Sequence, residues 1–231
     1  MFRYKMFKYA SIFSMMLFVL LVLVKATWSF ECKDGAGNPM SWWIVRQPPN
    51  KRGRFHFIHE GDQNPQQMHR SSTMDSRNNP IHESLKPFYN RTNTTRNADT
   101  IFIAYSDQSA SLKRKEGRFS LEEIPRRYGS GPAKGVFYFS RSLKKGVWMQ
   151  FSIPKFPILS RTVFLLDMKQ VAKGHTWTCL SLDGEENLVT MAKMLELIHP
   201  NIGELHIGQN LVDRMKSQSF LRTVHPTFPD S

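Results

Sequence analysis

The sequence predicts an α/β fold: a mixed β-sheet with flanking helices. Short runs of β-branched and aromatic residues recur along the chain between turn-forming residues, a pattern typical of strands. One segment, Leu188–Ile198, has its apolar residues at helical spacing. The chain has 231 residues and no visible internal repeat. This length suits one hydrophobic core better than two, so we expect a single lobe over residues 30–209.

The first residues predict a signal peptide. A basic start without acids precedes an apolar run from Ala10 to Val24, and the small residues Ala26 and Ser29 follow as cleavage positions. The apolar run has about 15 residues, fewer than the roughly 20 that a bilayer-spanning helix needs. An uncleaved anchor is the alternative. We therefore expect residues 1–29 to be removed and the secreted chain to carry no membrane segment.

In the first half of the chain, apolar runs predict three strands. These are Ser41–Val45, Phe55–Ile58 and Thr100–Tyr105. The last run is nearly apolar throughout, so we expect it to be buried on both faces. Gly61–Pro80 is polar and is predicted to be a long surface loop. The charged segment Ser106–Arg127 is predicted to be irregular.

The second half predicts a β-hairpin and a further strand. Gly135–Phe139 and Gly146–Ile153 are the arms of the hairpin, and the basic segment Arg141–Lys145 is its turn. Trp177–Leu182 is the next strand. We read the basic turn as a charged surface feature rather than as a binding groove.

The helix Leu188–Ile198 carries start and stop signals. Asp183 is expected to cap its N-terminus, and Glu186 three residues later completes a capping box. Pro200 is expected to end the helix. Residues 210–231 have weak periodicity and are expected to form a poorly ordered tail.

Two cysteines lie in the mature part of the chain. In an oxidising compartment an even count favours one disulfide, Cys32–Cys179, and two buried thiols are the alternative. Secretion also makes Asn90 and Asn93 available for N-glycosylation, because each begins an Asn-x-Thr sequon. The two sequons are three residues apart, so we do not expect both to be filled at once.

The charge of the chain is strongly basic. The sequence has 32 Lys and Arg against 19 Asp and Glu, a net charge of +13. Without the leader, 28 basic residues remain and the net charge is +9. Such a field attracts polyanions, so DNA is an expected partner; heparin-like sugars and anionic lipid are alternatives, as is simple solubility. The oligomeric state stays open.

Neither a metal nor another cofactor is expected. The cysteines and histidines do not have zinc-site spacing, and no glycine-rich loop leads into a helix as nucleotide binding requires.

The segment Gly131–Gly135, which reads Gly-Pro-Ala-Lys-Gly, has the clearest chemical character. Lys134 lies at the start of an apolar strand, where its ammonium group can hold a phosphate. A solvated lysine without a function is the alternative. Pro132 lies two residues before Lys134, and proline has no group that attacks phosphorus or transfers a proton.

Several segments, taken in order, carry a family resemblance. They are Glu31–Pro39 with Trp42–Val45, Leu85–Tyr89, Ala104–Gln108, Gly135–Phe139 with Gly146–Trp148, Ser152–Pro157, and Thr178–Leu182. Together they resemble the N-terminal half of the deoxyribonuclease II family, a branch of the phospholipase D-like superfamily. The resemblance covers about Glu31 to Leu205 and implies a single phospholipase D-like lobe.

The resemblance implies a metal-independent endonuclease that hydrolyses DNA phosphodiesters. In the family, two His-x-Lys elements supply a nucleophilic histidine, an acidic histidine and lysines that hold the phosphate. The first element reads Gly-His-Thr-Lys-Gly. Here Gly131, Lys134 and Gly135 match it, and Pro132 stands at the histidine position. The second element lies far downstream in family members, and this sequence ends at Ser231 before reaching it.

The histidines of the chain do not replace the missing one. None of the eight is followed two residues later by lysine, so His-x-Lys occurs nowhere in this sequence. Gly174-His175-Thr176 is similar to the element, but Trp177 replaces the lysine, and we predict His175 to be a surface or packing residue.

The sequence therefore predicts a secreted or lysosomal deoxyribonuclease II-like protein without catalysis, in which Lys134 remains as a phosphate-binding position. Two alternatives stay open. One is an active acid DNA endonuclease, as the family implies. The other is a secreted effector or decoy that binds another protein.

Overall fold

The structure is a computed structural model of the chain. It describes residues 30–49, 55–62, 78–89, 99–107, 110–115, 118–123, 133–154 and 173–208. The predicted signal peptide, the tail 210–231 and the sequons at Asn90 and Asn93 lie outside these residues, so the domain boundaries and the glycosylation sites stay predictions.

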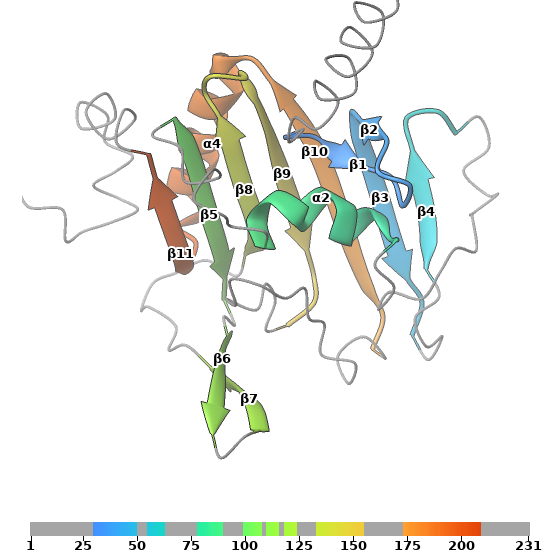
Figure 1. Ribbon diagram of the computed structural model, residues 1–231, viewed down its shortest axis with the longest axis vertical. Helices are drawn as coiled ribbons and strands as arrows, with labels where there is room; N and C mark the ends of the chain where they lie inside the picture. The colour runs from blue at the N-terminus through green and yellow to red at the C-terminus, as the bar shows by residue number, and fades with distance from the viewer. Residues whose placement is uncertain are drawn as a thin grey trace, which may run out of the picture.

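A seven-stranded sheet forms the body of the described structure (Figure 1). Its strand order is β11-β5-β8-β9-β10-β3-β4. In chain order the strands are β3 (Trp42–Gln47), β4 (His56–His59), β5 (Thr100–Ser106), β8 (Lys134–Ser140), β9 (Lys145–Phe151), β10 (His175–Asp183) and β11 (Ile202–Ile207).

Two short strand pairs and two helices complete the described elements. One pair is β1 (Cys32–Lys33) with β2 (Pro39–Met40), and the other is β6 (Ala110–Lys115) with β7 (Arg118–Glu123). The helices are α2 (Pro80–Tyr89) and α4 (Glu185–Ile198). Neither described helix is long and apolar enough to cross a membrane.

The predicted fold class, a single α/β lobe with a sheet and flanking helices, is confirmed. The expectation of mixed strand directions is not met within the described residues, where every strand pairing is antiparallel. Apolar runs reveal strands but carry little information on strand direction.

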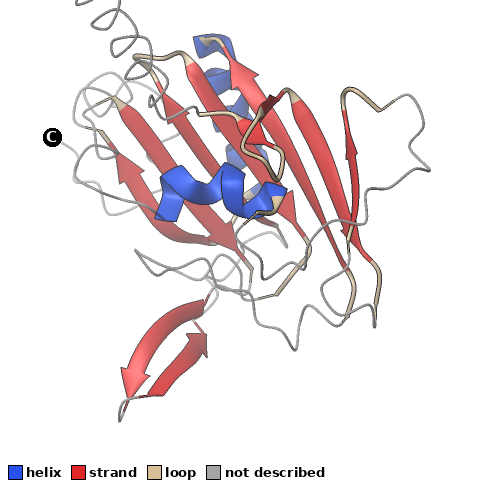
Figure 2. Cartoon of the chain, turned by 45° about the vertical axis from the view of Figure 1, so that its right-hand side comes forward, coloured by secondary structure: helices blue, strands red, loops and turns tan. Residues whose placement is uncertain are grey.

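The two helices cover opposite faces of the sheet (Figure 2). On one face Ile81 and Leu85 of α2 join the larger apolar cluster, and on the other Met191 and Leu195 of α4 join the second. Because successive side chains of a strand point to opposite faces, β5 contributes to both clusters. All its residues are buried, as its apolar sequence predicts.

The strands predicted from apolar runs are confirmed, with boundaries shifted by a few residues. The hairpin of β8 and β9 pairs Phe139 with Gly146 next to the predicted basic turn. The expectation that Ser106–Arg127 is irregular is wrong, because β6 and β7 form a hairpin there. A high density of charged residues obscures the alternation of that segment.

Helix α2 and strand β11 were not predicted either. Helix α2 begins at the end of the expected loop and contains Pro87, and sequence reasoning ends helices before a proline because proline lacks the N–H. Strand β11 contains Gly203 and an irregularity between Ile202 and Glu204, which break the period-two pattern.

Helix α4 ends as predicted but begins differently. His199 adopts a left-handed conformation with φ 42°, its N–H donates to the Leu195 carbonyl, and Pro200 follows. The prediction of a capping box formed by Asp183 and Glu186 is wrong. Gly184 occupies the N-cap with φ 94° and no side-chain capping bond. A positive φ favours glycine, so the backbone conformation of Gly184, rather than a capping side chain, directs the chain into the helix.

The predicted disulfide Cys32–Cys179 is present, with 6.0 Å between the Cα atoms. Both cysteines are fully buried in the larger apolar cluster. The bond ties β1 to β10, where Cys179 lies opposite Trp43 and Met149. It therefore fixes the start of the described chain on the sheet.

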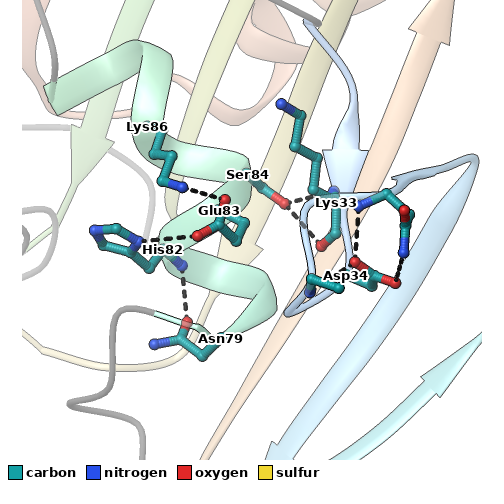
Figure 3. Close-up of polar contacts among 9 residues, drawn as sticks. Lys33, Asp34, Asn79, His82, Glu83, Ser84 and Lys86 are labelled. Carbon is teal, nitrogen blue, oxygen red and sulfur yellow. Dashed lines mark hydrogen bonds and ion pairs between the residues drawn. The ribbon is translucent and has the colours of Figure 1, made fainter.

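Ser84 of α2 joins three other elements through polar contacts, and Figure 3 shows those with Lys33. Its Oγ accepts a hydrogen bond of 2.8 Å from the Lys33 N–H in β1 and one of 3.4 Å from Trp43 Nε1 in β3. Its carbonyl accepts a 2.6 Å hydrogen bond from the Tyr138 hydroxyl in β8. Ser84 is completely buried, so these contacts satisfy polar groups that water cannot reach.

We expect Ser84→Ala to destabilise the fold by about 1–3 kcal/mol, because the Lys33 N–H and the Trp43 Nε1–H then stay buried without an acceptor. Urea unfolding followed by circular dichroism measures the loss. Ser142→Ala, at an exposed residue, is the control. Equal midpoints for the two variants contradict the assigned role of Ser84.

Candidate functional site

Lys134 is the first residue of β8 and lies at the end of the sheet where β5 finishes. In the β5–β8 register Lys134 is opposite Ser106. The next residue along β5, Asp107, donates its N–H to the Ala133 carbonyl at 3.2 Å. Two segments far apart in sequence are thereby held side by side, and their charged side chains meet.

Lys134 and Asp107 form an ion pair, with Nζ and Oδ1 2.5 Å apart. Their side chains are 14% and 15% exposed, so the pair is largely shielded but open at one edge. An anionic ligand at Lys134 must compete with this carboxylate. The sequence predicted Lys134 but not its partner, because the pairing depends on strand register rather than on spacing.

Gly135 allows β8 to pass close to Tyr105 of β5. A Cβ atom at residue 135 would lie 2.3 Å from the Tyr105 hydroxyl oxygen and 2.7 Å from the Met149 carbonyl oxygen. Such distances do not occur between unbonded atoms, so only glycine fits. The glycine after Lys134 therefore serves the packing of the strands.

The Tyr105 hydroxyl is a structural group. It lies 2.8 Å from Trp148 Nε1, which donates to it, and the side chain is fully buried. Burial raises the pKa of Tyr105 to about 12, although hydrogen bonds to Trp148 and Gln150 act in the opposite direction. The phenol stays neutral at physiological pH and does not supply a proton-transfer group.

A hollow of about 330 Å³ adjoins Lys134. Its lining comes from the start of β8 and from the neighbouring parts of β9 and β10: Ala133, Lys134, Gln150, Phe151, Ser152, Thr176 and Thr178. Hydroxyls and one ammonium group dominate its polar side chains. Such groups can hold phosphate or sugar oxygens by hydrogen bonds and charge. The lining contains no imidazole, thiol or carboxylate.

His175 lies behind this lining. Its Nδ1 is 3.4 Å from Ser152 Oγ, and its ring packs edge-on against Trp177 with the ring centres 6.0 Å apart. Proton transfer between a hydroxyl and a base takes place over about 2.6–3.2 Å, so the contact of 3.4 Å between Ser152 and His175 is long for this purpose. His175 is 8% exposed, so of the two predicted alternatives, a surface or a packing residue, the structure shows a packing residue.

Of the other predicted site residues, the described cysteines Cys32 and Cys179 are not brought to Lys134. Gly131 and Pro132 lie outside the described residues, although Pro132 directly precedes Ala133 in the chain. The disulfide lies on β10, separated from β8 by β9. Among the described residues no group of three or more His, Cys, Asp or Glu could hold a metal ion.

A second polar cluster, which the sequence did not predict, surrounds Glu83 on α2 (Figure 3). Glu83 is 6% exposed and forms an ion pair with Lys86. His82 Nδ1 is 3.6 Å from the same carboxylate, and the His82 N–H donates to Asn79 Oδ1 at 2.8 Å, which caps the helix. These partners all come from α2 and its cap, so the cluster stabilises the helix.

The turn between β1 and β2 is also held by a carboxylate. Burial raises the pKa of Asp34, but hydrogen bonds from Asn38 and Ala36 outweigh it, and the pKa lies below its ordinary value of 3.8. Asp34 therefore stays ionised in mildly acidic solution and continues to hold the turn.

An α/β lobe with a lysine at the start of a central strand, beside a hollow lined by hydroxyls, is a fold and a site suited to binding phosphate. The sequence model of the family described as Deoxyribonuclease II matches residues 31–226. The chain therefore belongs to the deoxyribonuclease II family.

Two proteins of Caenorhabditis elegans are similar to the chain. Deoxyribonuclease-2 is 24% identical over 227 residues, which cover 86% of this chain and 57% of the relative. Cell death-related nuclease 6 is 24% identical over 206 residues, which cover 84% of this chain and 48% of the relative. The chain thus spans about half the length of these relatives.

Proposed function

We propose that this chain is a deoxyribonuclease II-family protein of the secretory pathway that binds the phosphates of DNA without cutting them. The observation that carries this proposal is Pro132, two residues before Lys134, at the position where the family's first element has its histidine. Membership of the family supports DNA as the polyanion.

The lack of cleavage follows from the chemistry of the element. Metal-independent hydrolysis in this family requires an imidazole that attacks phosphorus and a second group that protonates the leaving oxygen. Proline offers neither a nucleophile nor a proton. Among the hydroxyls that line the hollow, that of Ser152 lies 3.4 Å from His175 Nδ1, a long contact for a base that would activate a hydroxyl for attack.

Binding without cleavage rests on Lys134 and on the basic charge of the chain. The Lys134 ammonium lies at the rim of the hollow and is partly exposed. A phosphate that enters the hollow replaces Asp107 as the partner of this ammonium, while nearby hydroxyls donate to its oxygens. The net charge of +9 that remains without the leader raises the local concentration of any polyanion.

Plasmid cleavage tests the catalytic part of the proposal. The purified protein is incubated with supercoiled plasmid at pH 5 in EDTA, beside the Pro132→His variant. We expect no nicking by the wild type. Nicking that appears only in the variant assigns the missing activity to residue 132, and nicking by the wild type overturns the proposal.

Substitutions in the ion pair test the binding part. We expect Lys134→Gln to weaken binding to duplex DNA, because a phosphate contact is lost, and Asp107→Asn to strengthen it, because the competing carboxylate is gone. One charge-assisted contact of about 1.5–3 kcal/mol corresponds to roughly a 10–100-fold change in affinity. Fluorescence anisotropy with a labelled duplex gives both dissociation constants.

The control is that Lys134→Gln and Asp107→Asn change the DNA affinity in opposite directions. If the ion pair is only structural, both substitutions lower thermal stability to a similar extent and neither changes DNA affinity at a temperature where the variants are folded. Undetectable binding of wild-type protein to DNA at low salt removes DNA from the proposal and favours a protein partner.

The proposed secretory route rests on the leader, the sequons and the buried disulfide. Expression of the full chain in eukaryotic cells tests it. We expect the protein in the medium or in lysosomes, with a new N-terminus near Ala26 or Ser29 and a mass that falls on glycosidase treatment. Cytosolic protein that retains Met1 contradicts the route.

A further inference from the structure

The β6–β7 hairpin stands apart from the main sheet. Its strands form a separate two-stranded sheet and pair with each other over six positions, from Ala110 opposite Glu123 to Lys115 opposite Arg118. In both views the hairpin extends beyond the end of the sheet at which β5 finishes and β8 begins (Figures 1 and 2). Along the chain it lies between Asp107 and Lys134, so both of its ends lead back to the candidate site.

The register divides the hairpin into two faces. Residues directly opposite each other in an antiparallel pair share a face, and the faces alternate along each strand. One face therefore has Lys113 opposite Ser120 and Lys115 opposite Arg118, with Ser111 opposite Glu122 at the end away from the turn. The other face has Leu112 opposite Leu121 and Arg114 opposite Phe119.

The positive charge is concentrated in the half of the hairpin far from the main sheet. The six residues from 113 to 118 include four Lys or Arg and one Glu, whereas Glu122 and Glu123 are at the other end of β7. Isolated two-stranded hairpins are only marginally stable. The hairpin forms a sheet of its own and does not extend the main one, so its concentrated charge calls for a functional explanation.

We propose that the β6–β7 hairpin is an arm that binds duplex DNA, with the face of Lys113, Lys115 and Arg118 on the phosphate backbone. The proposal rests on the proposed DNA binding and names the surface that supplies its affinity. A two-stranded ribbon fits the major groove, which is about 12 Å wide. A strand of six residues is roughly 20 Å long, enough to cross the groove and reach phosphates on both sides.

Duplex DNA fits the arm better than a lipid surface does. Binding to a bilayer depends on an apolar face that enters the headgroup region. The far end of this hairpin carries basic residues rather than apolar ones, and its leucine pair is nearer the main sheet. A rod-like polyanion can also contact the arm and Lys134 at once, because the arm extends beyond the end of the main sheet at which β8 begins with Lys134.

The test compares two variants with equal loss of charge. The arm variant combines Lys113→Gln, Lys115→Gln and Arg118→Gln. The control variant combines Lys33→Gln in β1, Lys144→Gln in the turn between β8 and β9, and Lys193→Gln in α4. Anisotropy with a labelled 25-base-pair duplex gives the dissociation constant over a salt series, and thermal unfolding confirms that both variants are folded.

We expect the arm variant to flatten the slope of log K against log salt by about 2.7, because each lost phosphate contact removes roughly 0.9 from the slope. The control variant keeps a slope close to that of the wild type. Equal slopes for the two triple variants overturn the arm while leaving the proposed DNA binding intact. Undetectable binding of the wild type overturns both proposals.

Two further probes distinguish the polyanion. Heparin and phosphatidylserine vesicles are offered to the same three proteins. Tighter binding of duplex DNA than of either probe, with loss in the arm variant, supports the proposal. An arm-dependent preference for heparin or for vesicles overturns duplex DNA as the ligand.

Discussion

Replacement of both Cys32 and Cys179 by alanine is expected to lower the free energy of unfolding by about 2–5 kcal/mol. The disulfide closes a loop between residues 147 apart in sequence. In the chain-entropy model a loop of this order restricts the unfolded chain by roughly 4–5 kcal/mol. For a chain of this size each 1 kcal/mol corresponds to about 2–4 °C in Tm, so the shift is readily measured.

The position of the bond adds to the loss. Both sulfurs lie inside the larger apolar cluster, so two alanines leave unfilled volume there in addition to the lost cross-link. β1 has only two residues, and in the described part of the chain it pairs with β2. Besides the disulfide, the hydrogen bond from the Cys32 N–H to Ser181 Oγ, at 2.8 Å, holds it against β10. Calorimetry of the wild type and the double variant gives the difference.

A reductant provides the control for this experiment. Dithiothreitol should lower the Tm of the wild type toward that of the Cys32→Ala/Cys179→Ala variant and leave the variant unchanged. A wild-type Tm that is insensitive to complete reduction, verified by thiol titration, contradicts the stabilising role of the bond.

The strands of the sheet could be predicted from sequence because each is a continuous apolar segment between turn residues. β5 is the clearest example, since burial on both faces makes its whole sequence apolar. The elements that sequence reasoning missed carry residues with conflicting propensities. α2 contains Pro87 and β11 contains Gly203, and tertiary packing overrides the local preference in both.

The candidate site was predictable only in part, for a related reason. Lys134 was found because its own neighbours in sequence give it a recognisable setting. Asp107 and Tyr105 contact this region through the pairing of β5 with β8, which sequence spacing does not reveal. The prediction of the α4 N-cap failed for a similar reason. The conformation of Gly184, rather than the Asp183 side chain, shapes the turn before the helix.

Gly135→Ala is expected to destabilise the fold by about 2–6 kcal/mol, from overpacking of roughly 1–3 kcal/mol and a displaced buried hydroxyl of roughly 1–3 kcal/mol. The added methyl group would lie 2.3 Å from the Tyr105 hydroxyl oxygen, 2.4 Å from its Cζ and 2.7 Å from the Met149 carbonyl oxygen. The Tyr105 ring is buried, and its hydroxyl accepts a hydrogen bond from Trp148. The Met149 carbonyl belongs to the backbone of β9, so neither group moves easily. Urea unfolding measures the loss.

Gly61→Ala is the matched control, because a Cβ at residue 61 meets only the His59 side chain, at 3.3 Å. The two alanine variants should also differ in DNA binding. In Gly135→Ala, a shift of β8 moves Lys134 away from Asp107 and from the hollow, so the affinity for duplex DNA should fall toward that of Lys134→Gln. Gly61→Ala should bind as the wild type does. A stable Gly135→Ala protein with unchanged affinity would show that β8 tolerates the methyl group, contrary to the close packing against Tyr105.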